Sequence, residues 1–306
     1  MNAQPSAVEA VDRAAMPATL ERLPSTDLLA EFSAREDGDA VSAWWLGQAG
    51  FCIRWRDLRI AVDPYLSDSL ARKYAGTRFP HRRMMAAPVQ PEQLTQLDFV
   101  FCTHAHTDHM DGDTLSAIAR SNARCRFVVP LAERAKALER GVPADRMITL
   151  RAGDELPIGP GASVAVVPAA HEERRSDADG NDLYLGYVLK LGERTLYHPG
   201  DCVPFEGLED WLRPHRIELA LLPVNGRDAL RASNGVPGNF HLQEAVELCC
   251  AVGIGRMLGH HYGMFDFNTV QPEDSEREIA RMRPVCGASL VRAATRYVLK
   301  AAPANA

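Results

Sequence analysis

Several features of secreted and membrane proteins are missing from this 306-residue sequence. No run approaches the roughly 18 consecutive apolar residues that a membrane-spanning helix needs. The N-terminal segment, MNAQPSAVEAVDRAAMPATLERL, contains acidic residues and no continuous apolar stretch, so it lacks the pattern of a secretory signal. The seven cysteines form no C-x-x-C pair, and their odd number suits reduced thiols. We therefore expect a cytoplasmic protein with no membrane partner.

The sequence also has no excess of basic residues, no internal repeat and no low-complexity segment. Its 34 Lys and Arg residues against 40 Asp and Glu residues give a formal net charge of -6. Proteins that bind nucleic acid usually present a basic face, so no nucleic-acid partner is expected. The G-x-S-x-G turn that carries the nucleophilic serine of many hydrolases is missing as well. The sequence therefore gives no sign of a serine nucleophile of that type.

What the sequence does contain is a dense group of metal-ligating residues in FCTHAHTDHMDGDT, which begins at Phe101. His104, His106, Asp108 and His109 fall within six positions, and burying them without partners would be costly. Residues i and i+2 of an extended segment point to the same side, so His104 and His106 can bind one divalent ion. Asp108 and His109 lie beyond and could reach a second ion, typically about 3.5–4 Å from the first.

Five apolar runs each end at a possible ligand. Asp63 ends LRIAVD, His104 follows FVFCT, His171 follows VAVVPAA, Asp201 follows TLYHPG and His261 follows RMLGH. Groups at the ends of several strands can converge at one rim of a sheet. The downstream residues are therefore predicted to complete the ligand set. Imidazole and carboxylate ligands suit Zn, Mn or Fe better than Ca or Mg.

The apolar pattern predicts sheets covered by helices. A helix is expected at 114–120 with Asp113 as its N-cap, and another at 242–249. Consecutive strands come first and strand–helix alternation follows, which favours one α/β or α+β unit. Strands are expected at 42–47, 51–55, 58–63, 98–103, 126–130, 163–169, 183–191, 194–201, 217–224, 256–261 and 288–299.

Two segments concentrate positive charge. RKYAGTRFPHRR, from Arg72 to Arg83, carries five cations and no acid, and NGRDALR adds two arginines. Arginine binds phosphate through two parallel hydrogen bonds, so these segments indicate a small anionic substrate. The alternative for the first segment is a solvated face that pairs with acids elsewhere. The candidate substrate-binding residues are Arg78, Arg82, Asn225, Arg227 and Arg231.

The motifs HAHTDH, VDP, HPGD and a late histidine, together with His171, resemble the metallo-β-lactamase superfamily over most of the chain. The resemblance implies an αββα sandwich with a dinuclear metal site at one edge. It implies a single hydrolase domain at 39–300. The residue pattern itself predicts an N-terminal appendage at 1–38, helical around 26–34, and a tail at 301–306. The family's last ligand usually precedes an aromatic residue, which favours His261 over its neighbour His260. The implied roles are His104, His106 and His171 for the first metal; Asp108, His109 and His261 for the second; Asp201 as the bridge; and Asp63 as an outer residue that orients the ligand loop. His260 is expected beside the ligands as a second outer residue.

A narrower resemblance, carried by WWLGQAGF, LPVNGRDALR, GNFHLQEAVELC and HHYGMFDFN, is to the L-ascorbate-6-phosphate lactonase group. It implies a homo-oligomer, two divalent ions (Mn by resemblance, Zn equally by ligand chemistry) and a phosphorylated sugar-acid lactone as substrate. Two metal ions would lower the pKa of a shared water, and the resulting hydroxide would attack the lactone carbonyl. Asp108 or Asp201 would pass a proton to the leaving oxygen, and both stay open. The alternative function is a metal-dependent phosphodiesterase acting on a small phosphodiester.

Overall fold

Eight α-helices occur among residues 18–35 and 38–302, which are the residues that the computed structural model describes. Short 3₁₀ segments also occur at Pro91–Gln93, Leu131–Glu133, Ala144–Arg146 and Arg213–His215. The α-helices are α1 (Leu28–Ser33), α2 (Ser69–Lys73), α3 (Gly112–Ser121), α4 (Arg134–Glu139), α5 (Leu208–Leu212), α6 (Ala229–Ala232), α7 (Leu242–Val252) and α8 (Pro272–Met282).

Two sheets form the centre of the protein. The first has the order β1-β15-β2-β3-β4-β5-β6-β7 and the second the order β14-β13-β12-β11-β10-β9-β8. The strands of the first sheet are β1 (Ala18–Pro24), β2 (Val41–Gly47), β3 (Gly50–Trp55), β4 (Leu58–Val62), β5 (Phe99–Phe101), β6 (Arg126–Pro130), β7 (Met147–Leu150) and β15 (Thr295–Ala301). Those of the second are β8 (Glu155–Gly159), β9 (Ala162–Pro168), β10 (Leu185–Leu191), β11 (Arg194–His198), β12 (Leu219–Pro223), β13 (Arg256–His260) and β14 (Gly287–Leu290).

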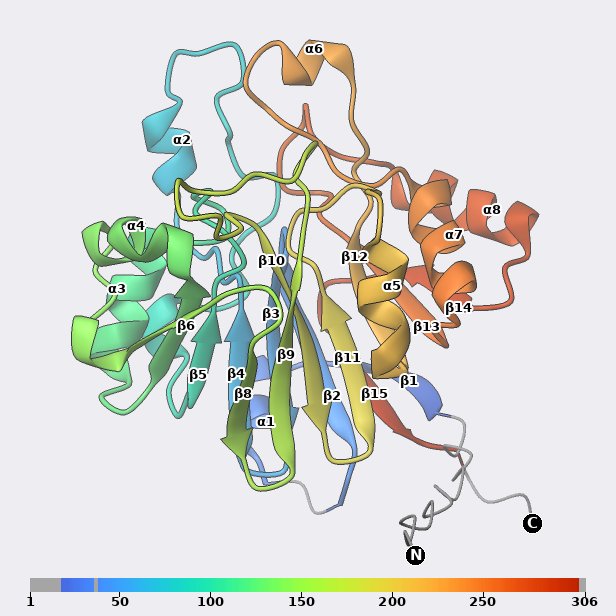
Figure 1. Ribbon diagram of the computed structural model, residues 1–306, viewed down its shortest axis with the longest axis horizontal. Helices are drawn as coiled ribbons and strands as arrows, with labels where there is room; N and C mark the ends of the chain where they lie inside the picture. The colour runs from blue at the N-terminus through green and yellow to red at the C-terminus, as the bar shows by residue number, and fades with distance from the viewer. Residues whose placement is uncertain (1–17, 36–37, 303–306) are drawn as a thin grey trace, which may run out of the picture.

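The two sheets face each other, and helices cover both outer surfaces. Helices α3 and α4 lie on one side of the sheets, and α5, α7 and α8 lie on the other (Figure 1). This arrangement confirms the αββα sandwich that the sequence predicted. No helix among the described residues combines the length and the apolar character needed to cross a membrane.

Strand β2 shows how the sequence builds these layers. All seven of its residues, VSAWWLG, are buried, so apolar material must lie on both faces of the strand. Val41, Ala43 and Trp45 belong to the core between the sheets, whereas Trp44 and Leu46 belong to the core beneath the helices. The alternation follows from the two-residue period of a strand. Continuous burial therefore identifies β2 as a central strand.

Part of the segment expected to be an N-terminal appendage is incorporated into this architecture. Strand β1 pairs with β15 along its whole length. In α1, Phe32 is buried and its ring meets that of Trp44 edge-on, with ring centroids 5.8 Å apart. The guanidinium of Arg59 in β4 donates to the carbonyls of Phe32 (2.9 Å) and Ser33 (2.8 Å). The boundary at residue 38 stays a prediction, and residues 1–17 lie outside the described part of the chain.

Four local expectations need adjustment. The N-cap of α3 is Asp111, whose side chain accepts from the Thr114 amide, and not Asp113. The run at 288–299 divides into β14 and β15, which belong to different sheets. Strands β1, β7 and β8 were not expected, and all three lie at sheet edges, where half-exposed positions weaken the apolar pattern. The expected tail begins within β15, at Ala301, and residues 303–306 lie outside the described residues.

Replacement of Phe32 by Ala tests whether α1 contributes to the core. We expect the free energy of unfolding to fall by about 3–5 kcal/mol, because the substitution removes a buried ring and leaves a cavity. Urea unfolding followed by circular dichroism measures this. The control is Leu230→Ala, where the side chain is 51% exposed and a change of less than about 0.5 kcal/mol is expected. Equal, small effects of both substitutions would contradict a structural role for α1.

Candidate metal centre

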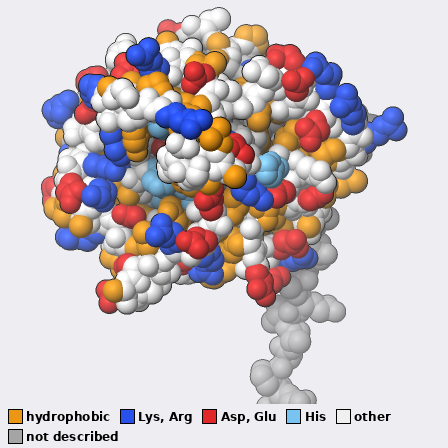
Figure 2. All heavy atoms as spheres, turned by 90° about the horizontal axis from the view of Figure 1, so that it is seen from above, with side chains coloured by type: hydrophobic (Ala, Val, Ile, Leu, Met, Phe, Trp, Pro, Cys, Tyr) orange, Lys and Arg blue, Asp and Glu red, His pale blue; other side chains and the backbone are white. Residues whose placement is uncertain are grey.

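The ends of several strands bring the candidate ligands together at one end of the sandwich. Strands β4 and β5 are parallel neighbours in the first sheet, as are β11, β12 and β13 in the second. Parallel strands open into loops at the same edge, and the segments after β4, β5, β9, β11 and β13 meet there. In Figure 1 this is the end that carries α2 and α6. Figure 2 looks onto this end and shows histidine side chains recessed below the surrounding surface, with Lys and Arg side chains nearby.

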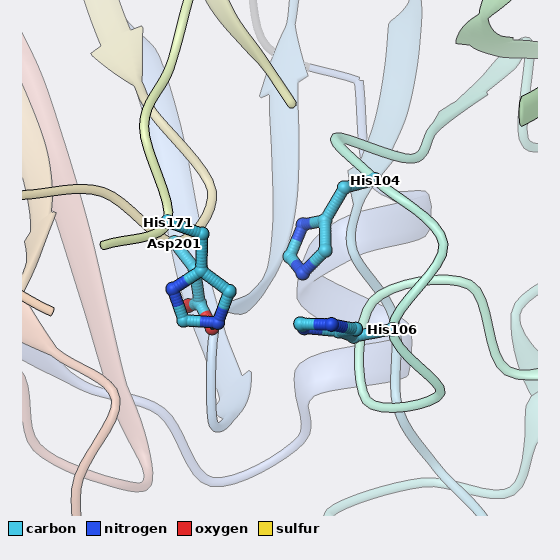
Figure 3. A group of neighbouring side chains, drawn as sticks. All are labelled: His104, His106, His171 and Asp201. Atoms are coloured by element: carbon cyan, nitrogen blue, oxygen red, sulfur yellow. The ribbon is translucent and has the colours of Figure 1, made fainter. Parts of the chain in front are cut away.

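A first group consists of His104, His106, His171 and Asp201. One potential ligand atom from each residue lies within 4.8 Å of those of the others. His104 and His106 approach from one side and His171 and Asp201 from the other, so that the side chains face a common space (Figure 3). The Nε2 atom of His171 is 3.3 Å from Oδ2 of Asp201. Three imidazoles and a carboxylate thus converge from three loops.

A second group consists of Asp108, His109 and His261, whose ligand atoms also lie within 4.8 Å of one another. Oδ1 of Asp201 is 3.2 Å from Nε2 of His109 and 2.9 Å from Nε2 of His261. Asp201 therefore presents one carboxylate oxygen to each group. This is the position that a bridging carboxylate between two ions would occupy.

Outer contacts fix the orientation of the imidazoles. Asp63 accepts hydrogen bonds from Nδ1 of His109 (2.6 Å), from the Thr103 amide (2.8 Å) and from the Thr103 hydroxyl (2.6 Å). Nδ1 of His171 donates to the carbonyl of Gly238 at 3.0 Å. In both histidines the outer nitrogen is held as a donor, so Nε2 is the nitrogen that faces the centre and would bind a cation. Asp63 therefore has the orienting contacts that the sequence predicted for it.

The residues fit a divalent metal. Nε2 of His104, Nε2 of His109 and Oδ1 of Asp201 are buried and have no hydrogen-bond partner among the described residues, although they face one another. Buried polar atoms without partners are destabilising. A cation at the common point of each group would satisfy these atoms, and nitrogen and carboxylate donors suit Zn or Mn. The chain therefore holds a cluster able to bind metal.

The charge state of the cluster is set by burial and by Asp201. Burial holds the pKa of His104 well below its usual range and lowers the pKa of His171 to about 4, so both are neutral near pH 7. Burial alone would also lower the pKa of His109, but the carboxylates of Asp201, Asp63 and Asp108 outweigh it and raise that pKa well above the usual value. Without metal, a proton on His109 therefore balances part of the negative charge.

The adjacent histidines in LGHHY have different surroundings. The imidazole of His261 faces Asp201, whereas His260 is buried against other rings. Its ring centroid is 5.4 Å from that of Phe51 and 5.2 Å from that of His198, with which it stacks. The structure thus brings His261 into the second group and leaves His260 behind it, 6.5 Å from His261 between ring centroids.

The residues expected to bind substrate do not surround the metal centre. Arg227 donates to both carboxylate oxygens of Glu244, at 2.6 and 2.7 Å, and so is already paired. Arg231 is paired with Asp228 and also donates to Asn268, which accepts a further hydrogen bond from Asn225 at 2.7 Å. The side chains of Arg78 and Arg82 are exposed and are not among those that line the pocket over the metal centre.

That pocket is lined instead by residues that sequence reasoning missed. Lys73 and Arg140 bring positive charge to the same space as His106, Asp108 and Asp201. Lys73 belongs to the cationic run that the sequence identified, but its role could not be separated from that of its neighbours. Arg140 follows α4, far from any ligand in sequence, and no local pattern indicated it. Further lining residues are Tyr74, His81, Phe265 and Asn268.

The pairing of Arg227 with Glu244 predicts a stabilising rather than a substrate-binding role. The hydrogen bond from Arg227 lowers the pKa of Glu244, so the pair's contribution is present above the unfolded-state pKa of about 4.3 and is lost as pH falls through the lower folded-state value. We expect Arg227→Ala to lower the free energy of unfolding by about 1–2 kcal/mol at pH 7 and by less at pH 3.

Urea unfolding at the two pH values measures this difference. The control is Arg35→Ala, which removes an exposed pair with Asp57 and should change stability by less than about 0.5 kcal/mol. Unchanged stability of Arg227→Ala, combined with weaker binding of anionic substrates, would contradict the structural role.

Several named proteins and solved structures are similar to this chain over most of its length. An N-acyl-phosphatidylethanolamine-hydrolyzing phospholipase D from Caenorhabditis elegans is 26% identical, over 85% of this chain and 75% of that protein. A UPF0173 metal-dependent hydrolase from Pyrobaculum neutrophilum is 23% identical, over 77% of this chain and 90% of that protein. Igni18, a metallo hydrolase from Ignicoccus hospitalis, has a TM-score of 0.64 at 17% identity, over 85% of this chain and 99% of its own. This structural likeness shows a shared fold.

The family model described as "Beta-lactamase superfamily domain" matches residues 58–262, more than half of the chain. The matched region contains every candidate ligand from His104 to His261 and also Asp63. The narrower resemblance to the ascorbate-6-phosphate lactonase group stays a prediction. By the family match and by its His/Asp cluster, the chain belongs to the metallo-β-lactamase superfamily and is a metal-dependent hydrolase.

Proposed function

We propose that this hydrolase opens a lactone of a sugar acid that carries a phosphate or another anionic group, such as L-ascorbate 6-phosphate. The observation that carries the proposal is the position of Asp201 between two ligand groups at the base of a pocket that Lys73 and Arg140 also line. The two groups would hold two divalent ions, Mn or Zn. The cations could bind the anionic end of the substrate while its carbonyl lies over the ligand groups.

When bound, the metal ions supply Lewis acidity and lower the pKa of a water molecule. The chain's own residues determine the rest of the reaction. Asp201, with 5% of its side chain exposed, is enclosed between the two groups and holds them together. The side chain of Asp108 is 16% exposed and lines the pocket. Asp108 is therefore the carboxylate that we assign to accept the proton that the attacking water releases and to pass it to the leaving ring oxygen.

A phosphodiester is the second candidate substrate. The relative from Caenorhabditis elegans is named for hydrolysis of N-acyl-phosphatidylethanolamine as a phospholipase D. The same centre could bind a phosphoryl group, because two adjacent cations stabilise both the attacking and the leaving oxygen of a phosphodiester. The lactone and the phosphodiester differ in the reacting atom, so substrate assays separate them.

The first test combines metal analysis with paired substrates. The chain purified without added metal should contain close to two Mn or Zn ions, by elemental analysis, and should hydrolyse sugar-acid lactones. Asp201→Ala should lose at least about 100-fold in activity together with metal content, because it removes the group shared by both positions. The control is Asp179→Ala in an exposed loop, which should leave both unchanged.

Two results would contradict this proposal. Turnover of bis-p-nitrophenyl phosphate without lactone turnover would replace the lactone with the phosphodiester. A fully active, metal-replete Asp201→Ala protein would contradict the two-metal centre itself.

The role of Lys73 in recognising an anionic substrate can be tested separately. Its ammonium lies over the ring of Tyr74, 5.0 Å from the centroid, and no ion pair with a carboxylate involves it among the described residues. We expect Lys73→Ala to raise KM for a phosphorylated lactone about 10-fold, with little change for an uncharged lactone, because only the former loses a charged contact. The control is Lys136→Ala on α4, whose ammonium pairs with Glu139. Equal effects on both lactones would exclude charge recognition by Lys73.

A further inference from the structure

Gln48 lies next to the second ligand group, although the metal-ligand motifs do not include it. It occupies the turn between β2 and β3, in WWLGQAGF, and its side chain is completely buried. Its φ of 51° places the backbone in the left-handed region, which residues other than glycine seldom adopt. Such strain persists only where surrounding contacts enforce it, and it concentrates at functional sites.

Both ends of Gln48 contact the second group. Its Nε2 donates to Oδ2 of Asp108 at 2.8 Å and lies 3.2 Å from Nε2 of His261. Its main-chain carbonyl accepts from the His261 amide at 3.0 Å and from the indole Nε1 of Trp45 at 2.9 Å. None of its hydrogen bonds among the described residues involves His104, His106 or His171 of the first group. Gln48 is therefore tied to one group only.

We propose that Gln48 is a positioning residue for the second metal position, acting through Asp108 and His261. A carboxylate on a rotatable side chain has two equivalent oxygens, and a fixed donor at Oδ2 selects one orientation of Asp108. The carbonyl of Gln48 fixes the backbone of His261, which is itself left-handed with a φ of 66°. When His261 gives its lone pair to a cation, Asp108 remains as the acceptor for the amide of Gln48.

This selectivity has an energetic consequence. Removing a hydrogen-bonding partner of a metal ligand typically weakens metal binding by about 10–100-fold. Because the contacts of Gln48 reach only the second group, the loss should fall on one of two ions. If Gln48 merely supported the fold, its substitution would lower the affinity for both ions and would also lower the stability of the metal-free chain.

The experiment is a titration of the metal-free, full-length chain with Mn²⁺, followed by electron paramagnetic resonance and by competition with a chelator. We expect Gln48→Leu to bind one ion with wild-type affinity and the second about 10–100-fold more weakly. The matched control is Gln243→Leu, which removes an equivalent amide–carboxylate hydrogen bond (2.7 Å to Glu247) from the exposed face of α7. It should bind both ions as the wild type does.

A double-mutant cycle tests the route through Asp108. In an Asp108→Ala background, Gln48→Leu should lower the affinity for the second ion by less than it does in the wild type. The reason is that the acceptor of the Gln48 amide is already absent. Gln48→Met, which also lacks the donor, serves if the Leu variant does not fold. Thermal unfolding of the metal-free variants shows whether the fold is affected.

Three results would overturn the proposal. The first is a Gln48→Leu variant that binds both ions with wild-type affinity. The second is an equal loss of affinity for both ions together with a lower melting temperature. The third is a wild-type chain that binds a single ion. The proposal rests on the two-metal centre and not on the lactone. No substrate enters the titration, so a failed lactone assay leaves its outcome unaffected.

Discussion

The carboxylate of Asp201 is the group on which the rest of the centre depends. One oxygen faces His171 and the other faces His109 and His261, so three histidines from three loops share a single anion. Burial would raise the pKa of Asp201, but the neighbouring histidines hold it well below its usual value. An ionised carboxylate is therefore retained in an interior that would otherwise disfavour it. Loops from both sheets thus bring their ligands to the same anion.

Unusual backbone conformations hold the residues around this carboxylate in place. Gln48, Asp63 and His261 all adopt positive φ angles, and each touches a ligand or is one. At Gly200, in HPGD, a Cβ atom would lie 2.2 Å from the hydroxyl of Thr103, so glycine permits a close approach just before Asp201. That same hydroxyl donates to Asp63, which in turn accepts from His109. A side chain at residue 200 would therefore disturb ligands in both sheets.

Much of the fold and the ligand set could be predicted because both depend on local patterns. Buried strands such as β2 give continuous apolar runs, and ligands at strand ends follow directly after them in sequence. His104, His171 and Asp201 were found in this way, and the structure brings them together. Edge strands β1 and β8 escaped prediction, since their half-exposed residues lack a clear apolar face.

The residues that surround the metal centre were harder to predict for a physical reason. The charge of an arginine is visible in sequence, but its partner is not. Arg227 follows a buried strand, as a substrate-binding residue would, yet Glu244, seventeen positions later on α7, binds its guanidinium. Arg140, by contrast, comes from a helix end without any motif and yet lines the pocket, where it also donates to the carbonyl of Met110 in the ligand loop at 2.7 Å. An arginine that forms an ion pair with an acid from a distant part of the chain is therefore not free to face the pocket. Only the tertiary arrangement distinguishes a cation that stabilises the fold from one that is available to bind an anion.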